Sequence, residues 1–427
     1  MHPLRILSLV LPLIVFAGCA VNPVTGKKEF SLVPASQEIA IGTQNYLPYQ
    51  QQQGGRYIVD PELSLYVNGV GQKLAAVSDR SKLPFEFTVL NNDVPNAWAL
   101  PGGKIAVNRG LLLLLDDEAQ LAAVLSHEIV HAAAKHGANQ MTQSILLGLG
   151  TQVATVASRN TDYGDLVALG ANTSAGLWSA RYGRDQELES DAYGIEYMVR
   201  AGYDPQAAVE LQQTFVKLSG SKQSSWMNTL FASHPPSQER VDKNKALVQS
   251  TPAGGVRNRA RYLKAIGQII KDNPAYQQHQ QALKAASDNN TSQALSLLDS
   301  AIKKQPDEAL FYATKGQMLL AAKKEADATQ AFAKAAQKNP EYYVGFLGLG
   351  LIQKKQNKTA QAKANLLKST QFLPTQIAVY HLGEIELTQG NKDAAVQYFS
   401  AAASQGGELA QKAQSQLAIL QPSTPAQ

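Results

Sequence analysis

Residues 116–131 read DDEAQLAAVLSHEIVH, and this stretch predicts both a helix and a metal site. Asp116 and Asp117 provide an N-terminal cap and a favourable negative charge for a helix that follows them. Apolar side chains then recur at helical spacing. His127 and His131 are four residues apart, so on a helix both imidazoles lie on one face and can bind the same ion.

Glu128 lies beside the first histidine, where a catalytic base is expected. A zinc ion lowers the pKa of a water molecule, and a nearby glutamate takes the proton and later passes it to the leaving amine. The site also needs a third protein ligand. His136 is the nearest histidine, but the metzincin spacing would require one at residue 137, which is glycine. We expect His136 to lie at the end of the same helix, where a basic ring is favourable.

A second acidic cluster follows at residues 184–191, which read RDQELESD. Glu187 and Asp191 are four residues apart and would share one helix face. Glu187 is the predicted third ligand, while Asp191 would accept the second N–H of a ligating histidine and fix its ring. We expect Glu189 to point away into solvent. A charged surface helix is the alternative for such a cluster, and the histidine pair upstream favours the ligand interpretation.

The order His-Glu-x-x-His followed by Glu-x-x-x-Asp resembles peptidase family M48 (Ste24-like), which consists of zinc metalloendopeptidases of the gluzincin type. The resemblance extends to residues 96–103 (NAWALPGG) and to His234-Pro235 with Arg240, and it covers roughly residues 36–245. It implies a mainly α-helical metalloprotease domain with a small β-sheet. It also implies one Zn²⁺ per chain held by His127, His131 and Glu187, with Glu128 as general base and Asp191 fixing a ligating histidine.

His234 has three possible roles. It could polarise the scissile carbonyl and stabilise the developing oxyanion. It could instead take the fourth zinc position and hold the enzyme inactive until a substrate displaces it. The third possibility is a loop histidine that caps the turn at Pro235. We expect Arg240 to hold an acidic side chain of this loop and not to be catalytic.

The segment before the zinc helix is predicted to bind substrate as an edge strand. An extended peptide would add to it as one more strand, so main-chain hydrogen bonds would tolerate many sequences. The alternative is that the segment only packs beneath the zinc helix. The predicted substrate-binding residues are Asn96, Ala97 and Trp98.

Residues 1–19 read MHPLRILSLVLPLIVFAGC and predict a lipoprotein signal peptide that ends just before the cysteine. The last four residues resemble a bacterial lipobox, in which Cys19 becomes the lipid-carrying N-terminus. Ala20, rather than Asp, favours the periplasmic side of the outer membrane, with the periplasm as the location if Cys19 is not lipidated. The alternative is an ordinary buried helix. Cys19 is the only cysteine, so an internal disulfide framework and a multi-cysteine zinc site are excluded.

The C-terminal third contains an internal repeat. Pro306, Pro340 and Pro374 recur every 34 residues. Alanines at 294, 328 and 362 share one column of this alignment, and the larger side chains at 298, 332 and 366 share another. The period and the order of small and large residues resemble tetratricopeptide repeats over residues 275–407, with an unrelated helical bundle as the alternative. The glycines of residues 345–350 would lie inside a repeat helix and serve packing rather than nucleotide binding.

The chain of 427 residues is long enough for two or three domains. Its net charge of +5, from 39 basic and 34 acidic residues, gives no support for a nucleic-acid partner. We expect a signal peptide at 1–18, a tether at 19–35, the M48 domain at 36–250, a connecting helix at 251–274, an α-solenoid of tetratricopeptide repeats at 275–407, and a C-terminal helix and tail at 408–427.

Together these features predict a lipid-anchored zinc metalloendopeptidase of the bacterial envelope. By resemblance, it would hydrolyse misfolded or misassembled outer-membrane proteins, and its repeats would recruit clients or the outer-membrane β-barrel assembly machinery. The alternative is a chaperone or scaffold of outer-membrane assembly with latent proteolysis. A membrane-embedded prenyl-protein peptidase, as some M48 relatives are, is disfavoured because we find no convincing membrane span after the leader.

Overall fold

The computed structural model describes residues 19–153, 182–219 and 231–421. The chain divides into two compact units: Met1–Tyr49 with Asp60–Gln268, and Gln50–Val59 with Ile269–Gln427. The predicted signal peptide at residues 1–18 lies outside the described residues. Among the helices of the described residues, none is both long and apolar enough to cross a membrane.

The first unit contains a small three-stranded sheet made of β3 (Glu86–Leu90), β4 (Ala97–Leu100) and β5 (Lys104–Asn108). The strand order is β3-β5-β4, with β3 parallel and β4 antiparallel to β5. A short 3₁₀ turn at Pro101–Gly103 connects β4 to β5, and Gly102 and Gly103 adopt φ angles of 75° and 84° that favour glycine. Because β4 pairs with β5 alone in this sheet, it is an edge strand.

Helix α5 (Glu118–Ala133) is the central helix of the first unit, and every residue except His127 is buried. Its side chains are largely apolar on all faces, as a fully buried helix requires. The Asp117 side chain caps the helix by accepting a hydrogen bond from the Gln120 amide at 3.0 Å, as the sequence predicts. The helix contacts the sheet and the helices α3, α8 and α9. The first unit therefore holds its His-Glu-x-x-His segment rigidly.

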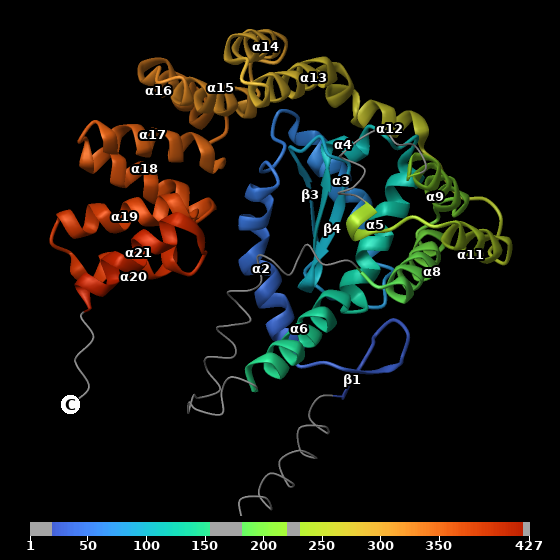
Figure 1. The fold of residues 1–427 in the computed structure, drawn as a ribbon. Coiled ribbons are helices and arrows are strands. Elements are labelled where there is room, and N and C mark those ends of the chain that lie inside the picture. Colours follow the sequence, from blue (N-terminus) through green and yellow to red (C-terminus); the bar gives the residue numbers. More distant parts are fainter. Residues whose placement is uncertain (1–18, 154–181, 220–230, 422–427) are drawn as a thin grey trace, which may run out of the picture. The chain divides into compact units, whose positions relative to one another are not determined.

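The other helices of the first unit surround α5 and the sheet (Figure 1). They are α2 (Ala35–Gln52, whose last residues fall in the second unit), α3 (Pro61–Ala75), α4 (Arg109–Leu112), α6 (His136–Val153), α8 (Arg184–Arg200), α9 (Gln206–Ser219), α11 (Gln238–Gln249) and α12 (Arg259–Ala265).

Residues 19–35, predicted as a tether, contain a hairpin of β1 (Cys19–Val21) and β2 (Lys28–Phe30), which pair antiparallel. We call residues 19–30 the N-terminal hairpin. The Asn22 side-chain oxygen stabilises its turn by accepting hydrogen bonds from the amides of Val24 and Thr25 at 3.0 and 3.3 Å.

The second unit is a series of helices that pack in sequential pairs. Residues 251–274, predicted as a connecting helix, contain α12 and the first part of α13. The helices are α13 (Gly267–Ser287), α14 (Thr291–Lys304), α15 (Ala309–Ala321), α16 (Glu325–Lys338), α17 (Tyr343–Lys355), α18 (Thr359–Phe372), α19 (Gln376–Thr388), α20 (Lys392–Ala403) and α21 (Gly407–Leu420).

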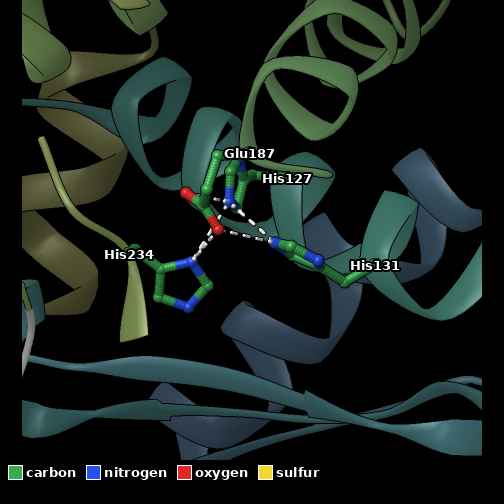
Figure 2. Close-up of side chains that lie close together, drawn as sticks. All are labelled: His127, His131, Glu187 and His234. Atoms are coloured by element: carbon green, nitrogen blue, oxygen red, sulfur yellow. Dashed lines mark hydrogen bonds and ion pairs between the residues drawn. The ribbon is translucent and has the colours of Figure 1, made fainter. Parts of the chain in front are cut away.

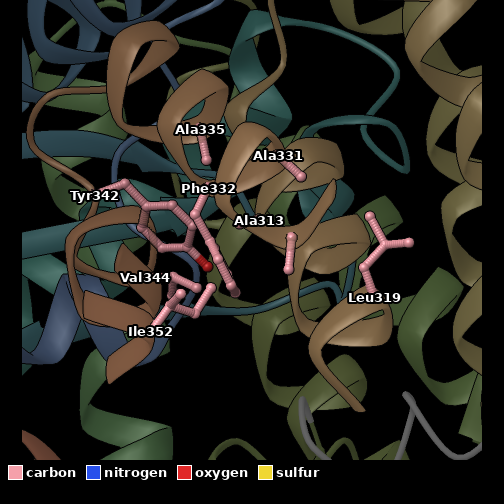
Figure 3. Close-up of a cluster of buried hydrophobic side chains, with 9 residues drawn as sticks. Ala313, Leu319, Ala331, Phe332, Ala335, Tyr342, Val344 and Ile352 are labelled. Atoms are coloured by element: carbon pink, nitrogen blue, oxygen red, sulfur yellow. The ribbon is translucent and has the colours of Figure 1, made fainter. Parts of the chain in front are cut away.

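Phe332 of α16 shows why the repeat needs both small and large residues. Its ring fills a buried cluster between α15, α16 and α17 (Figure 3). A Cβ added at Gly316 or Gly348 would approach the Phe332 ring to 2.8 or 2.5 Å, closer than real Cβ contacts allow. The prediction that the glycines of α17 serve packing is confirmed at Gly348, because only glycine lets α17 lie this close to α16.

Candidate metal centre

Three predicted ligands converge within the first unit (Figure 2). His127 and His131 project from α5, and Glu187 reaches them from the first turns of α8. The two Nε2 atoms are 3.0 Å apart, and the Glu187 carboxylate oxygens lie 3.5 Å from His127 Nε2 and 3.4 Å from His131 Nε2. His234 adds a fourth donor, and ligand atoms of all four residues lie within 4.8 Å of one another. Imidazole and carboxylate donors at this density suit a divalent cation such as zinc.

The charges of the site also suit a cation. Burial alone would lower the pKa of His127, but the carboxylates of Glu187 and Asp191 outweigh it and raise that pKa to about 10. Burial would raise the pKa of Glu187, yet the neighbouring imidazoles of His234 and His127 hold it well below its usual range. The site therefore keeps an ionised carboxylate and favours a positive charge between its donors.

His127 is held from behind by a carboxylate, as the sequence predicts. Its Nδ1 lies 3.0 Å from the Asp191 Oδ1. Arg240 in turn binds Asp191 through two hydrogen bonds of 2.6 and 2.7 Å, and it pairs with Glu187 at 2.7 Å. Both Asp191 and Arg240 are buried. Arg240 holds acidic side chains, as expected, but they are Asp191 and Glu187 of α8 and do not belong to the loop of His234.

The His131 ring is held by His136 and, through it, by Glu189, and the sequence-based expectations for both residues were wrong. His136 begins α6, because the chain reverses at Lys135, whose φ is 62°. Its Nδ1 lies 2.8 Å from His131 Nδ1, so it is not a surface residue at the end of α5. Glu189, expected to be solvated, accepts hydrogen bonds from His136 Nε2 at 3.3 Å and from Asn22 Nδ2 at 3.0 Å. Helical spacing could not show either contact, because each joins separate elements.

Tyr182 is a site residue that sequence reasoning missed. Its ring stacks on His131 with the centroids 3.7 Å apart and the planes inclined by 22°. Burial raises the pKa of its hydroxyl well above the usual value, so the residue is a neutral ring at physiological pH. It lies two residues before α8 and outside any motif, so only its proximity to the acidic cluster at 184–191 could have drawn attention to it.

The position of the Glu128 carboxylate in the site suits a general base. Burial raises the pKa of its carboxyl group above the usual value, which makes the carboxylate a stronger base. Its Oε1 lies 3.5 Å from His234 Nε2, and its Oε2 is buried without a hydrogen-bond partner among the described residues. A buried carboxylate oxygen without a partner is costly, so the geometry favours a ligand or water at this point.

His234 points into the cluster rather than capping the turn that follows it. Its Nδ1 lies 3.0 Å from Glu187 Oε1 and 3.3 Å from His127 Nε2 (Figure 2). Its side chain is only 10% exposed. This position is compatible with a fourth ligand or with a group that stabilises an oxyanion, and it excludes the loop-cap interpretation.

In the predicted substrate-binding segment, the side chains of Ala97 and Trp98 are buried, and Asn96 is partly exposed. Trp98 packs edge-on against Tyr46 and Tyr49, with centroids 6.0 and 4.7 Å apart. Ala97 lines a cavity of about 60 Å³ beside His127, Glu128 and His234. The rest of the lining is partly apolar and partly polar. Its apolar side chains include Leu111, Ile195, Met198, Leu211 and Phe215, and its polar side chains include Ser190, Gln212 and Asn244. The Trp98 side chain therefore packs against α2 rather than beneath the zinc helix, while the backbone of β4 forms the edge of its sheet.

Comparisons with known proteins agree with this architecture. Residues 61–248 match the model of peptidase family M48, and residues 279–343 and 347–410 match a tetratricopeptide repeat model. The chain is 30% identical to the beta-barrel assembly-enhancing protease of Yersinia pestis, over 52% of this chain and 47% of that protein. It is also 30% identical to the mitochondrial metalloendopeptidase OMA1 of Schizosaccharomyces pombe, over 52% and 64% of the two chains.

The chain therefore spans about half the length of the first of these relatives. Among solved structures, YrrB, described as a tetratricopeptide repeat protein with an unusual peptide-binding site, is similar over 38% of this chain and 92% of that chain, with 21% identity and a TM-score of 0.30.

Proposed function

Because residues 61–248 form a domain of peptidase family M48 and tetratricopeptide repeats follow it, we propose that this protein is a zinc metalloendopeptidase of the bacterial envelope. One observation carries the proposal. Two imidazoles of α5 and a carboxylate of α8 converge on one point, with the buried carboxylate of Glu128 beside it. Two histidines, one glutamate and an adjacent glutamate base are the groups that metal-assisted peptide hydrolysis requires.

His127, His131 and Glu187 would hold the zinc ion. When bound, zinc acts as a Lewis acid and lowers the pKa of a water molecule to about 7. Glu128 takes the proton of the attacking water and passes it to the leaving amine, and its raised pKa suits it to both steps. Asp191 and Arg240 keep the His127 ring oriented, and the exclusion of solvent from these groups strengthens their interactions.

The two remaining roles of His234 predict opposite results. A fourth ligand that blocks the site would make His234→Ala more active than the wild type. A group that stabilises the oxyanion would make the same variant less active, by about 10²–10³-fold in kcat. Its Nε2 makes no hydrogen bond among the described residues, whereas its Nδ1 lies 3.0 Å from Glu187 Oε1. The direction of the change in the His234→Ala variant therefore decides between the two roles.

The surroundings of the site suit an unfolded polypeptide. The edge of β4 can accept an extended chain as an added strand. The neighbouring cavity is lined partly by apolar side chains and would accept an apolar side chain of the substrate. Misfolded proteins expose both extended chain segments and apolar side chains.

Envelope clients and the outer-membrane location are further parts of the proposal. They are supported by the likeness to a bacterial relative named for β-barrel assembly and by the lipobox that ends at Cys19. A lipid at Cys19 would anchor the protein to the periplasmic side of the outer membrane. The repeats would recruit misassembled proteins or the β-barrel assembly machinery.

The test is Glu128→Gln, compared with Glu196→Gln as a control that removes one exposed charge from α8. We expect Glu128→Gln to retain zinc and to lose peptide hydrolysis by about 10²–10⁴-fold, because a general base is removed without a ligand. Unchanged hydrolysis would contradict the proposal. If Glu128→Gln lacks hydrolysis but fully complements an envelope defect, the alternative of a chaperone or scaffold is correct.

A further inference from the structure

A chain of hydrogen bonds runs from His131 to the N-terminal hairpin. His131 Nδ1 lies 2.8 Å from His136 Nδ1, and His136 Nε2 lies 3.3 Å from Glu189 Oε1. The same carboxylate oxygen accepts a hydrogen bond of 3.0 Å from Asn22 Nδ2. His131, His136 and Asn22 are each no more than 2% exposed. Four residues from four separate elements or turns thus form one buried connection.

The chemistry fixes the direction of these hydrogen bonds. A neutral imidazole that offers Nε2 to a cation carries its hydrogen on Nδ1. His131 Nδ1 therefore donates to His136 Nδ1, and the hydrogen of His136 lies on Nε2, from which it donates to Glu189. Asn22 can only donate through its Nδ2. Every group has a partner of the correct polarity, and the last acceptor is a carboxylate, which strengthens the series.

The N-terminal hairpin is firmly docked where it meets this series. The second Nδ2 hydrogen of Asn22 is directed to Glu29 Oε1 at 2.9 Å, and the other oxygen of Glu29 accepts from Asn139 of α6. Just beyond the hairpin, the Leu32 amide donates to Thr142 Oγ1 of α6 at 3.1 Å. Val33 then packs against Ala138 and Met141 of the same helix.

We infer that the N-terminal hairpin is part of the metal centre and that Asn22, Glu189 and His136 are positioning residues for His131. Asn22 fixes the Glu189 carboxylate, Glu189 fixes the His136 ring, and His136 holds the His131 ring with Nε2 towards the cluster. The inference rests on the proposed function, because it takes His131 as a metal ligand. Without these hydrogen bonds, metal binding itself would have to fix the orientation of the His131 ring, and the zinc affinity would fall.

The experiment measures the zinc affinity of the full chain by competition with a chromophoric chelator, and the melting temperature of the metal-free protein. Glu189→Gln removes the charge but keeps the shape. Asn22→Asp keeps the side-chain oxygen that accepts from Val24 and Thr25 but removes the donor to Glu189. Glu196→Gln on the exposed face of α8 is the matched control.

We expect Glu189→Gln and Asn22→Asp to weaken zinc binding by about 10–100-fold, and Glu196→Gln to leave it unchanged. The melting temperature of the metal-free protein should change little in Glu189→Gln and Glu196→Gln, whereas a merely structural role of Glu189 would lower it and leave the affinity intact. Asn22→Asp also replaces the donor to Glu29 by a carboxylate, so the melting temperature of this variant should fall as well. In the double variant, the introduced amide can donate to the introduced carboxylate, so that donor and acceptor are exchanged between the two positions. Its affinity loss should therefore be smaller than the product of the two single losses.

Two results would overturn the inference: wild-type zinc affinity in both single variants, or losses in the double variant that simply multiply. The proposed function fails differently. It fails if the wild type binds no zinc, or if replacing His127 or Glu187 leaves zinc binding unchanged. Wild-type hydrolysis and zinc binding with no effect at Asn22 and Glu189 would reject the positioning role alone.

Discussion

His127 and His131 are one turn apart on α5, yet the protein supports them in opposite ways. Behind His127 is a charged pair: Asp191 contacts the ring directly and is itself held by Arg240. Behind His131 is a second ring, and a carboxylate is reached only through it. Both carboxylates come from α8, two residues apart, so a single helix supports both rings from different sides.

The difference follows from burial. Asp191 is enclosed, and an isolated carboxylate there would be too costly without a cation, so Arg240 pairs with it. The Glu189 side chain is 18% exposed and is satisfied by neutral donors. The support of His127 therefore depends on helices of the domain core, while that of His131 extends to the N-terminal hairpin.

The largest expected effect is at Arg240. Arg240→Met would leave Asp191 and Glu187 buried without their cation, and we expect a loss of about 3–5 kcal/mol in the free energy of unfolding. Chemical denaturation measures this loss. Arg184→Met is the control, because Arg184 forms an exposed pair with Glu239 and its loss should cost far less. Equal losses in the free energy of unfolding of the two variants would show that the buried ion pair stabilises the fold no more than the exposed pair does.

Next is the direct comparison of the two carboxylates. Asp191→Asn should weaken zinc binding more than Glu189→Gln does, within the range of about 10–100-fold, because Asp191 contacts its histidine without an intervening ring. Competition with a chelator measures both. If Glu189→Gln costs as much as Asp191→Asn, the two supports are equivalent and the proposed asymmetry is wrong.

Removal of the metal gives a third test, on stability. A chelator should lower the melting temperature of the wild type, because zinc at 100 times its Kd stabilises the fold by about 2.7 kcal/mol. Each tenfold loss of affinity should reduce that stabilisation by about 1.4 kcal/mol at a fixed zinc concentration. Differential scanning calorimetry should thus rank Asp191→Asn and Glu189→Gln as chelator competition does. A different ranking would mean that the variants act on the metal-free fold.

The smallest expected effect concerns Tyr182, whose ring stacks on His131. Tyr182→Phe keeps the stacked ring and should change zinc affinity by less than about threefold, whereas Tyr182→Ala should lose about 2–10-fold, the equivalent of one aromatic contact. The two variants are measured side by side by chelator competition. A larger loss in Tyr182→Phe would show that the hydroxyl, and not the stacked ring, supports His131.

Helical spacing predicted the parts of the site that lie within one element. The pair His127 and His131 and the pair Glu187 and Asp191 each share a helix face, and the structure brings the two faces together. The same reasoning failed for His136, which it placed at the end of α5 although it begins α6, and for Glu189, which it treated as solvated because it lies outside the shared face. The 34-residue period likewise placed residue 332 among the large side chains of the repeat, and the structure packs the Phe332 ring against Gly316.

The sequence by itself determined which chemistry is available, because the spacing of donors on a helix sets which side chains can reach one ion. It also determined the repeat architecture, because a short period fixes which faces are apolar. Only the tertiary structure decided which histidine Asp191 supports and which residues support His131. Asn22 and Glu189 are 167 residues apart, and no local rule relates them. Their contact exists because the N-terminal hairpin docks on α6 and reaches α8, and long-range packing alone sets that placement.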